Sequence, residues 1–220
     1  MTSTALGIDL GGTKVRAAVV TESGEILDDH REATEADTPA DNVFSNIVRA
    51  AHKACTEAGL EVNDLAGVGI GSPAPIDIER GMIVSPPNLP SLHGFPIVAK
   101  LQEALGKPTV LNNDGNCFGL AEGLYGAGKD TRVCCGLTLG TGLGCAVVVD
   151  EVLYNGPRGA AAEIWCSPHG DETIEESVSG RGISRNFERY TGQQADPPEI
   201  AELARGGSEH ALAAWADFGR

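Results

Sequence analysis

Basic residues are scarce in this chain. Its 220 residues contain 16 Lys and Arg against 31 Asp and Glu, which gives a net charge of −15 at pH 7. A nucleic-acid groove needs a basic patch or stripe, so we expect no nucleic-acid partner. The acidity favours solubility, and any bound nucleotide must therefore be held by local groups and a metal ion.

Long apolar runs are also missing. None approaches the ~20 residues that a helix needs to cross a bilayer, so we expect no membrane partner. The first residues lack the basic and apolar stretches of a secretory signal, which favours a cytoplasmic protein. The first strand begins at about Ala5, which leaves no room for a helix-turn-helix ahead of it.

The cysteines form no Cys-x-x-Cys pair. Most of them lie in apolar segments, so we expect buried free thiols in a reducing compartment instead of disulfides. The six are Cys55, Cys117, Cys134, Cys135, Cys145 and Cys166. The chain is 41% hydrophobic and 21% charged, an ordinary composition for one large or two small domains.

The chain opens with two short apolar strands joined by a glycine turn, and Asp9 stands at the end of the first strand. Gly11 and Gly12 allow another molecule to approach the backbone closely. Thr13 and Lys14 then add a hydroxyl and a cation. This combination suits a polyphosphate and its metal ion. A tight hairpin with an incidental Asp has the same pattern, so the turn alone leaves both interpretations open.

A second strand, glycine turn and strand follow over residues 133–150. The turn, Gly140–Gly144, again carries a threonine, Thr141. Two such hairpins predict two related lobes, each presenting a phosphate-binding turn to a shared cleft, where ligands tend to bind.

Between and after these hairpins, helical and extended patterns alternate, which indicates an α/β architecture. Helices are expected over 40–58, 97–105 and 114–125, the first capped by Thr38 or Asp41 and ended by Gly59. Strands are expected over 65–70 and 109–111, and mostly helices after residue 155. The predicted lobes are 1–115 and 116–220, with the boundary at the start of the helix near Asp114.

Four motifs together resemble the ROK family of sugar kinases, within the sugar kinase, actin and Hsp70 group of ATPases. They are the opening hairpin, the Gly140–Gly144 turn, Leu111–Cys117 and Gly159–Ile164. The resemblance implies an actin-like, ribonuclease H-like fold of two lobes. It also implies glucokinase-like phosphorylation of a hexose by ATP with Mg²⁺, and it leaves a homodimer open.

The resemblance assigns roles to particular residues. Asp114 is the expected catalytic base, because the positive end of the helix that follows favours its ionised form. Asp9 is the expected metal-side carboxylate, acting directly or through water. The expected sugar ligands are Asn113, Glu163, Glu175, Ala74 and Asn88. The expected phosphate ligands are Gly11, Gly12, Thr13 and Lys14 in the first lobe and Gly140, Thr141 and Gly142 in the second.

Simpler interpretations stand beside these roles. Asn112, Asn113 and Asp114 are all residue types that cap helices, and Asn88 is an ordinary turn residue. Glu163 and Glu175 are consistent with a solvated helix face in a chain this acidic.

The chain departs from the family at a zinc motif and in length. Cys166 stands where the family has histidine, and the cysteine cluster that would follow is absent. Cys166 and His169 alone supply two of the usual four ligands, so we expect no zinc.

Family members continue beyond residue 220, so we expect an incomplete second lobe and adenine pocket. The alternatives are a catalytically impaired sugar-binding fragment and a sugar-sensing regulator that lacks its DNA-binding segment.

Overall fold

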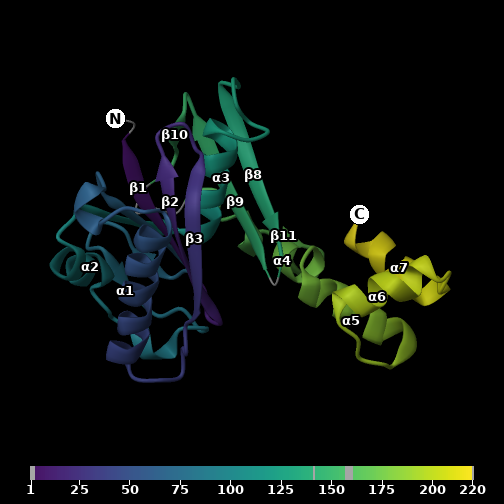
Figure 1. Cartoon of the computed structure of the whole chain (residues 1–220). Coiled ribbons are helices and arrows are strands. Elements are labelled where there is room, and N and C mark those ends of the chain that lie inside the picture. The colour runs from purple at the N-terminus through teal and green to yellow at the C-terminus, as the bar shows by residue number, and fades with distance from the viewer. Residues whose placement is uncertain (1–2, 141, 157–160, 220) are drawn as a thin grey trace.

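The computed structural model describes residues 3–140, 142–156 and 161–219. Figure 1 shows a large sheet with helices against it, a smaller sheet beside it, and a helical segment that extends away. The two sheets are separate in hydrogen bonding, and the chain passes from the first to the second through one helix. The molecule therefore has two sheet lobes followed by a helical segment.

The first sheet has five strands in the order β3-β2-β1-β4-β7. They are β1 (Thr4–Leu10), β2 (Lys14–Thr21), β3 (Ile26–Ala33), β4 (Val68–Ser72) and β7 (Thr109–Asn113). Strands β1 to β3 are antiparallel because short turns join them, whereas β4 and β7 run parallel to β1 and require crossover connections. The carboxyl ends of β1, β4 and β7 therefore meet at one edge of the sheet.

The crossover connections contain α1 (Ala40–Glu57) and α2 (Ile97–Leu105), close to the predicted ranges. The apolar face of α1 is buried through Val43, Ile47, Ala50, Ala51 and Ala54. The predicted caps of α1 are wrong, because its N-cap is Pro39 without a side-chain hydrogen bond. The hydroxyl of Thr38 donates instead to the Glu35 carbonyl at 2.8 Å.

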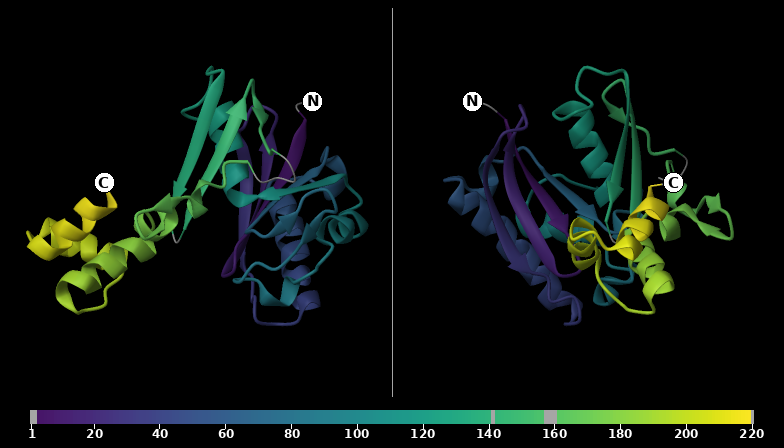
Figure 2. Two further views of the ribbon diagram at one scale, coloured as in Figure 1. Left: turned by 180° about the vertical axis from the view of Figure 1, so that it is seen from behind. Right: turned by 90° about the vertical axis from the view of Figure 1, so that its right-hand side faces the viewer.

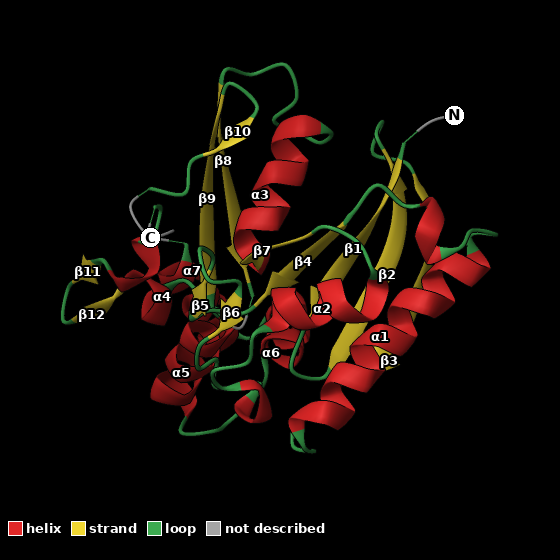
Figure 3. Ribbon diagram, turned by 90° about the vertical axis from the view of Figure 1, so that its left-hand side faces the viewer, coloured by secondary structure: helices red, strands yellow, loops and turns green. Residues whose placement is uncertain are grey.

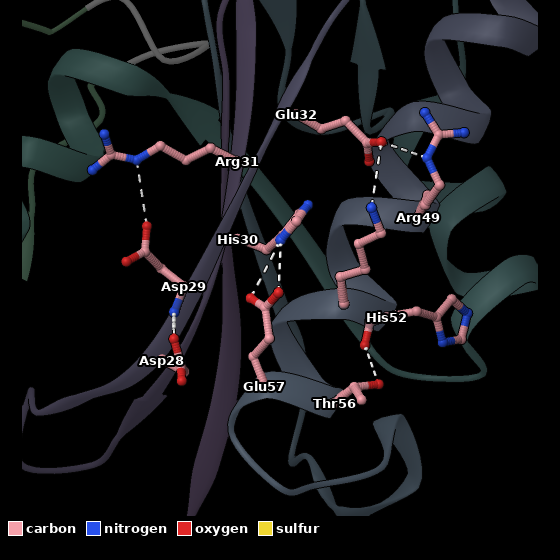
Figure 4. A network of polar contacts seen from close by, with 10 residues as sticks. Asp28, Asp29, His30, Arg31, Glu32, Arg49, His52, Thr56 and Glu57 are labelled. Atoms are coloured by element: carbon pink, nitrogen blue, oxygen red, sulfur yellow. Dashed lines mark hydrogen bonds and ion pairs between the residues drawn. The ribbon is translucent and has the colours of Figure 1, made fainter.

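Polar contacts fasten the outer strand β3 to α1 (Figure 4). His30 Nδ1 lies 3.0 Å from a Glu57 carboxylate oxygen, and Arg49 Nε lies 2.5 Å from Glu32 Oε1. These contacts lie on the side of the sheet that carries α1. They hold the helix against an exposed edge strand.

The second sheet contains β8 (Val133–Leu139), β9 (Leu143–Val149) and β10 (Val152–Leu153). Helix α3 (Asp114–Leu124) follows β7 directly and packs against one face of this sheet. The packing is close, because a Cβ built on Gly136 would lie 2.7 Å from Gly119 Cα. The opposite face of β8 is apolar and open, and three of its side chains are 52–56% exposed: Val133, Leu137 and Leu139.

The remaining segment is mostly helical, as predicted, and Figure 2 shows it extending away from both sheets. Its helices are α4 (Ile174–Ser177), α5 (Gly180–Thr191), α6 (Pro197–Arg205) and α7 (Glu209–Phe218). A hairpin of β11 (Pro168–His169) and β12 (Glu172–Thr173) precedes them and was not predicted. The helices share a small core of Ile183, Phe187, Ile200, Ala211 and Ala214. Shorter elements elsewhere include β5 (Ile76–Asp77) and β6 (Met82–Ile83).

All six cysteines are free thiols, but their predicted burial is wrong for five of them. Only Cys55 is buried, whereas Cys117, Cys135 and Cys166 are exposed. Cys135 is exposed because it belongs to the open face of β8, which has no covering layer in the part of the chain that the structure describes. Among the same residues, none of the helices combines the length and the apolar character that crossing a bilayer requires.

Candidate active site

Two carboxylates come together where the parallel strands end. Asp9 lies on β1 opposite Gly71 of β4, and Asp114 begins α3 directly after β7. Partial burial raises the pKa of the Asp9 carboxyl, the nearby charge of Asp114 raises it further, and Arg16 lowers it. The two acids are therefore close enough to repel each other, and a cation between them would relieve that repulsion.

The junction between β7 and α3 determines what each polar residue does. Asn113 is the N-cap, since its Oδ1 accepts the N–H groups of Gly115 at 3.0 Å and Asn116 at 3.4 Å. Asp114 is the first helical residue, its side chain is exposed, and its Oδ1 accepts the Gly115 N–H at 2.8 Å. Of the three candidate caps, Asn113 performs this role. The Asp114 carboxylate is thereby presented at the surface beside Asp9.

Cys117 lies one helical turn beyond Asp114, and its pattern predicts only a buried free thiol. A Cβ built on Gly71 would lie 3.4 Å from its Sγ. The residue as a whole is exposed but its sulfur is partly enclosed, and this enclosure, together with the charges of Asp114 and Asp9, raises the pKa of Cys117 to about 11. The thiol is therefore protonated at neutral pH and is a poor nucleophile.

The first glycine turn is supported by backbone. Gly11 N–H donates to the Lys14 carbonyl at 3.0 Å, and the Thr34 hydroxyl donates to the Gly11 carbonyl at 2.7 Å. A Cβ built on Gly12 would lie 2.7 Å from the backbone oxygen of Asn88. The structure thus brings the first turn against the proline-rich loop of Asn88.

Other first-lobe candidates are open to solvent. Thr13, Lys14 and Asn88 are exposed, and so is Ala74 in the loop that follows β4. Both Asn88 and Ala74 precede α2 and belong to the lobe that carries Asp9. Their exposure leaves them accessible to a ligand.

The second glycine turn is supported by a side chain from farther along the chain. Gly140 N–H donates to the Gly142 carbonyl at 2.9 Å, and the Leu143 N–H donates to Glu175 Oε2 at 3.0 Å. Glu175 also forms an ion pair with Arg181 at 2.7 Å. The structure therefore places Glu175 on this turn. Thr141, the predicted hydroxyl of the turn, lies outside the described residues.

Contacts at the start of α3 bring the second turn towards Asp114. A Cβ built on Gly115 would lie 3.7 Å from Gly144 Cα. Figure 3 shows β7 leading into α3, which runs alongside β8 and β9. The helix terminus that presents Asp114 thus also contacts the end of the second glycine turn.

Glu163 has a partner from its own segment, because the Trp165 indole N–H donates to its carboxylate. The Cys166 thiol donates to the Glu163 carbonyl at 3.1 Å. Gly159 and Ala160, which begin this predicted motif, lie outside the described residues. Within the described ranges no three His, Cys, Asp or Glu side chains gather as metal ligands, and the absence of zinc stays a prediction.

A cavity of about 1020 Å³ lies between the second glycine turn and the helical segment. Gly140 and Arg181 line one side, and Trp215 and Phe218 line another. The two aromatic rings contact each other edge to face, with centroids 5.6 Å apart. The cavity therefore combines an aromatic wall with a cation beside a glycine turn.

Comparisons with known proteins concern the family and the fold of the chain. A family model described as the ROK family matches residues 5–220. The glucokinase of Thermotoga maritima is 38% identical, over 94% of this chain and 71% of that protein. The glucokinase of Streptomyces coelicolor is 32% identical, over 90% and 62%. The N-acetyl-D-glucosamine kinase of Vibrio cholerae is 29% identical, over 94% and 73%. The chain thus spans 62–73% of the length of these relatives.

Solved structures give the same result. A ROK hexokinase from Thermus thermophilus superposes with a TM-score of 0.85 at 30% identity, covering 98% of this chain and 73% of that one. A ROK family glucokinase from Streptomyces griseus, in complex with glucose and AMPPNP, gives 0.77 at 27% identity, with coverage of 98% and 75%.

Proposed function

This chain belongs to the ROK family and has the actin-like ATPase fold of its sugar kinases, and we propose that it transfers the γ-phosphoryl group of ATP to a hexose hydroxyl. The observation that carries the proposal is the exposed Asp114 carboxylate beside Asp9, on a helix terminus that also contacts the second glycine turn. Phosphoryl transfer requires this set: a base, a metal-side carboxylate and phosphate-binding backbone.

Asp114 acts as the base in this proposal. It accepts the proton of the sugar hydroxyl while the hydroxyl oxygen attacks the γ-phosphorus and ADP departs. Asn113 uses its side-chain carbonyl to cap α3, and its Nδ2 donates one hydrogen to the Ser72 carbonyl at 3.5 Å, so the second hydrogen of this amide would donate to a sugar hydroxyl. Closure of the two lobes around the substrates would exclude water.

Asp9 fits the metal ion that the proposal requires. Mg²⁺ takes one or two carboxylates together with substrate phosphates and keeps several waters, so it does not need a cluster of three acidic ligands. Burial and the charge of Asp114 raise the pKa of Asp9 although Arg16 lowers it, so a cation bound here would stabilise the ionised carboxylate. When bound, Mg²⁺ would neutralise phosphate charge next to the base.

We place the phosphates of ATP between the glycine turns, with Lys14 as the cation of the first. The cavity of Trp215 and Phe218 then takes the nucleoside, because it opens beside Gly140. The AMPPNP complex of the Streptomyces griseus glucokinase supports ATP as donor. Binding of ATP should change the fluorescence of Trp215, and Trp215→Phe should remove that signal.

The substrate is a hexose, and glucose and N-acetylglucosamine are the two candidates that the named relatives favour. Glu163 remains a proposed sugar ligand, and the sugar would replace Trp165 at its carboxylate. Ala74 and Asn88 remain proposed ligands because both are exposed. Glu175 would have to leave the second turn in order to bind sugar.

Cellular location and assembly are part of the proposal. Six free thiols support a reducing cytoplasm. The open apolar face of β8 supports association of two copies, since exposed apolar patches commonly mark interaction sites. Sedimentation at several concentrations tests the dimer, and a monomer throughout would contradict it.

An assay of ADP release tests the activity, with glucose, N-acetylglucosamine, mannose and fructose as acceptors. We expect Asp114→Asn to lower kcat by about 10²–10⁴-fold, because it removes the base and keeps the shape of the side chain. Sugar affinity, measured by calorimetry, should change little. Asp130→Asn is the matched control, because Asp130 is exposed beyond the other end of α3.

The assay also separates the alternatives. ADP release by the Asp114→Asn variant at the unchanged rate would reject the assigned base. Sugar binding without ADP release by the unaltered chain would favour the impaired sugar-binding protein over the kinase.

A further inference from the structure

A side-chain hydrogen bond joins the Asp114 junction to the second lobe through residues that the proposed mechanism does not use. Asn112 lies at the end of β7, and its Nδ2 donates to Asn155 Oδ1 at 3.3 Å. Its Oδ1 accepts the Asn113 N–H at 2.8 Å and Asn116 Nδ2 at 3.0 Å. Both ends of the Asn112 amide are therefore engaged, one at the junction itself and one across to the second lobe.

Asn155 in turn holds the segment that leads to Glu163. Its backbone carbonyl accepts the Ala161 N–H at 2.9 Å. Gly156 follows with a φ of +63°, and a Cβ there would lie 3.0 Å from Ala161 Cβ. One residue thus links the start of the described Ala161–Glu163 segment to the strand that presents Asp114.

We propose that Asn112 and Asn155 are positioning residues, which fix the sugar-binding segment at the distance from Asp114 that proton transfer requires. This inference rests on the proposed kinase function. The physical reason is geometric: a displacement of about 1 Å at a reacting centre can cost about 10²-fold in rate. Both side chains are half-buried, so solvent competes only partly for their hydrogen bond.

The neutral amide also suits the charge of the site. Asn112 stands in the same row of the sheet as Gly71 and Asp9. A carboxylate at this position would add a third negative charge near Asp9 and Asp114, whereas an amide supplies a donor and an acceptor without charge. The position therefore favours an amide for reasons of electrostatics as well as reach.

The test removes the hydrogen bond between Asn112 and Asn155 by substituting Asn155. Asn155→Ala removes the bond to Asn112 and leaves the bonds of Asn112 to Asn113 and Asn116 in place. We expect the KM for hexose to rise and kcat to fall, together by about 10–100-fold in kcat/KM, while the KM for ATP changes less than about twofold. Asn155→Asp keeps the accepting oxygen but adds a negative charge, so it should recover part of the loss.

Tyr125→Phe is the matched control. The Tyr125 hydroxyl donates to the Glu22 carbonyl at 3.1 Å, a contact between the lobes at the opposite end of α3. Its loss should leave the KM for hexose unchanged. If Tyr125→Phe and Asn155→Ala shift the kinetics equally, the link acts as general support between the lobes, and the positioning role is rejected.

A second measurement needs no catalysis. Amide hydrogen exchange over residues 161–166 should become at least about tenfold faster in Asn155→Ala without any ligand, because the segment loses its tie to β7. Unchanged exchange would overturn the proposal. If the unaltered chain releases no ADP with any hexose, the proposed function fails, and faster exchange with weaker calorimetric sugar binding in the variant would still support the link.

Discussion

The two glycine turns share a local pattern and differ in what supports them. The first turn is closed by its own backbone and by Thr34, the residue that directly follows β3. The second turn is held by Glu175, which lies 32 residues beyond Leu143, and by Gly180 N–H on the Gly140 carbonyl at 2.7 Å. One turn is therefore part of a sheet, whereas the other depends on a helical segment.

This difference has a consequence for phosphate binding. Glu35 and Asp37 line a small cavity together with Gly12 and Thr13, and Lys14 adds a positive charge at the end of the first turn. A carboxylate lies against the second turn, and Arg181 balances its charge at 2.7 Å. The first turn is thus held mainly by backbone hydrogen bonds, whereas the second is held by one side chain and its ion pair.

Substitution of a glycine by alanine in each turn should give the largest difference in kcat/KM for ATP between the two turns. In Gly12→Ala the new Cβ would meet a backbone oxygen of Asn88 at 2.7 Å, so the loop must move. In Gly142→Ala it would meet Glu175 Oε2 at 2.5 Å, the flexible end of a side chain. We expect kcat/KM for ATP to fall about 100-fold in the first variant and about 10-fold in the second.

Steady-state kinetics with varied ATP measures both effects. Gly69→Ala is the steric control, because a Cβ on this β4 glycine meets nothing within 4 Å. A larger fall of kcat/KM for ATP in Gly142→Ala than in Gly12→Ala would contradict the inference that the first turn accommodates a new side chain less readily than the second.

Substitution of Glu175 should have the next largest effect on the kinetics. It distinguishes a role in supporting the second turn from a role as a sugar ligand. Glu175→Ala removes the acceptor for Leu143 N–H and the ion pair with Arg181, whereas Glu175→Gln keeps an acceptor. If Glu175 supports the turn, the KM for ATP should rise about 10-fold in the first variant and about 3-fold in the second. A rise confined to the KM for hexose would identify Glu175 as a sugar ligand instead.

Asp9 precedes the first turn, and its ionised carboxylate should lower the stability of the folded state at neutral pH. Since folding raises its pKa above the ordinary 3.8, the folded state holds the Asp9 proton more tightly than the unfolded chain does. That stabilisation is complete below pH 3.8 and is lost as the pH rises through the folded-state pKa. At pH 7, Asp9→Asn should therefore raise Tm by about 1–2 °C. Thermal unfolding followed by circular dichroism checks this, and a lower Tm at pH 7 would refute it.

Glu176 follows Glu175 in the chain, and its pKa is shifted in the opposite direction to that of Asp9. Its substitution should give the smallest change in Tm. Hydrogen bonds from the Thr173 N–H and hydroxyl hold the pKa of Glu176 below its ordinary 4.5. The stabilisation is present above pH 4.5 and is lost as the pH falls through the folded-state pKa. Glu176→Gln should lower Tm slightly at pH 7, and the difference from the unaltered chain should vanish in acid. A higher Tm at pH 7 would remove the contrast with Asp9.

Local pattern predicted much of the fold. The helix at Ile97–Leu105 matches its predicted range, the strands Val133–Leu139 and Leu143–Val149 lie within the predicted unit over 133–150, and Gly59 follows α1 with a φ of +70°. The strand predicted over 65–70 lies instead at Val68–Ser72. Leu65 is buried and its backbone is extended, but it lies outside the sheet, between a short 3₁₀ turn and β4.

The candidate site was predicted in part. Asp114 at the start of a helix follows from the strand-to-helix change at residues 109–125, and the structure presents it there. Glu175 on the second turn, and the link from Asn112 to Asn155, have no local signal, because the sequence pattern around each residue is unchanged by a partner tens of residues away.

The sequence by itself determined the two strand–glycine–strand units, the helix that begins at Asp114, and the acidic character of the chain. These depend on backbone preference and periodicity within a few residues. Only the tertiary structure decided that Asn113 is the cap, that Asp9 and Asp114 repel each other, and that one face of β8 is open. Each of these depends on which strands are neighbours and how α3 packs between the lobes, and contacts between distant segments form only when the whole chain folds.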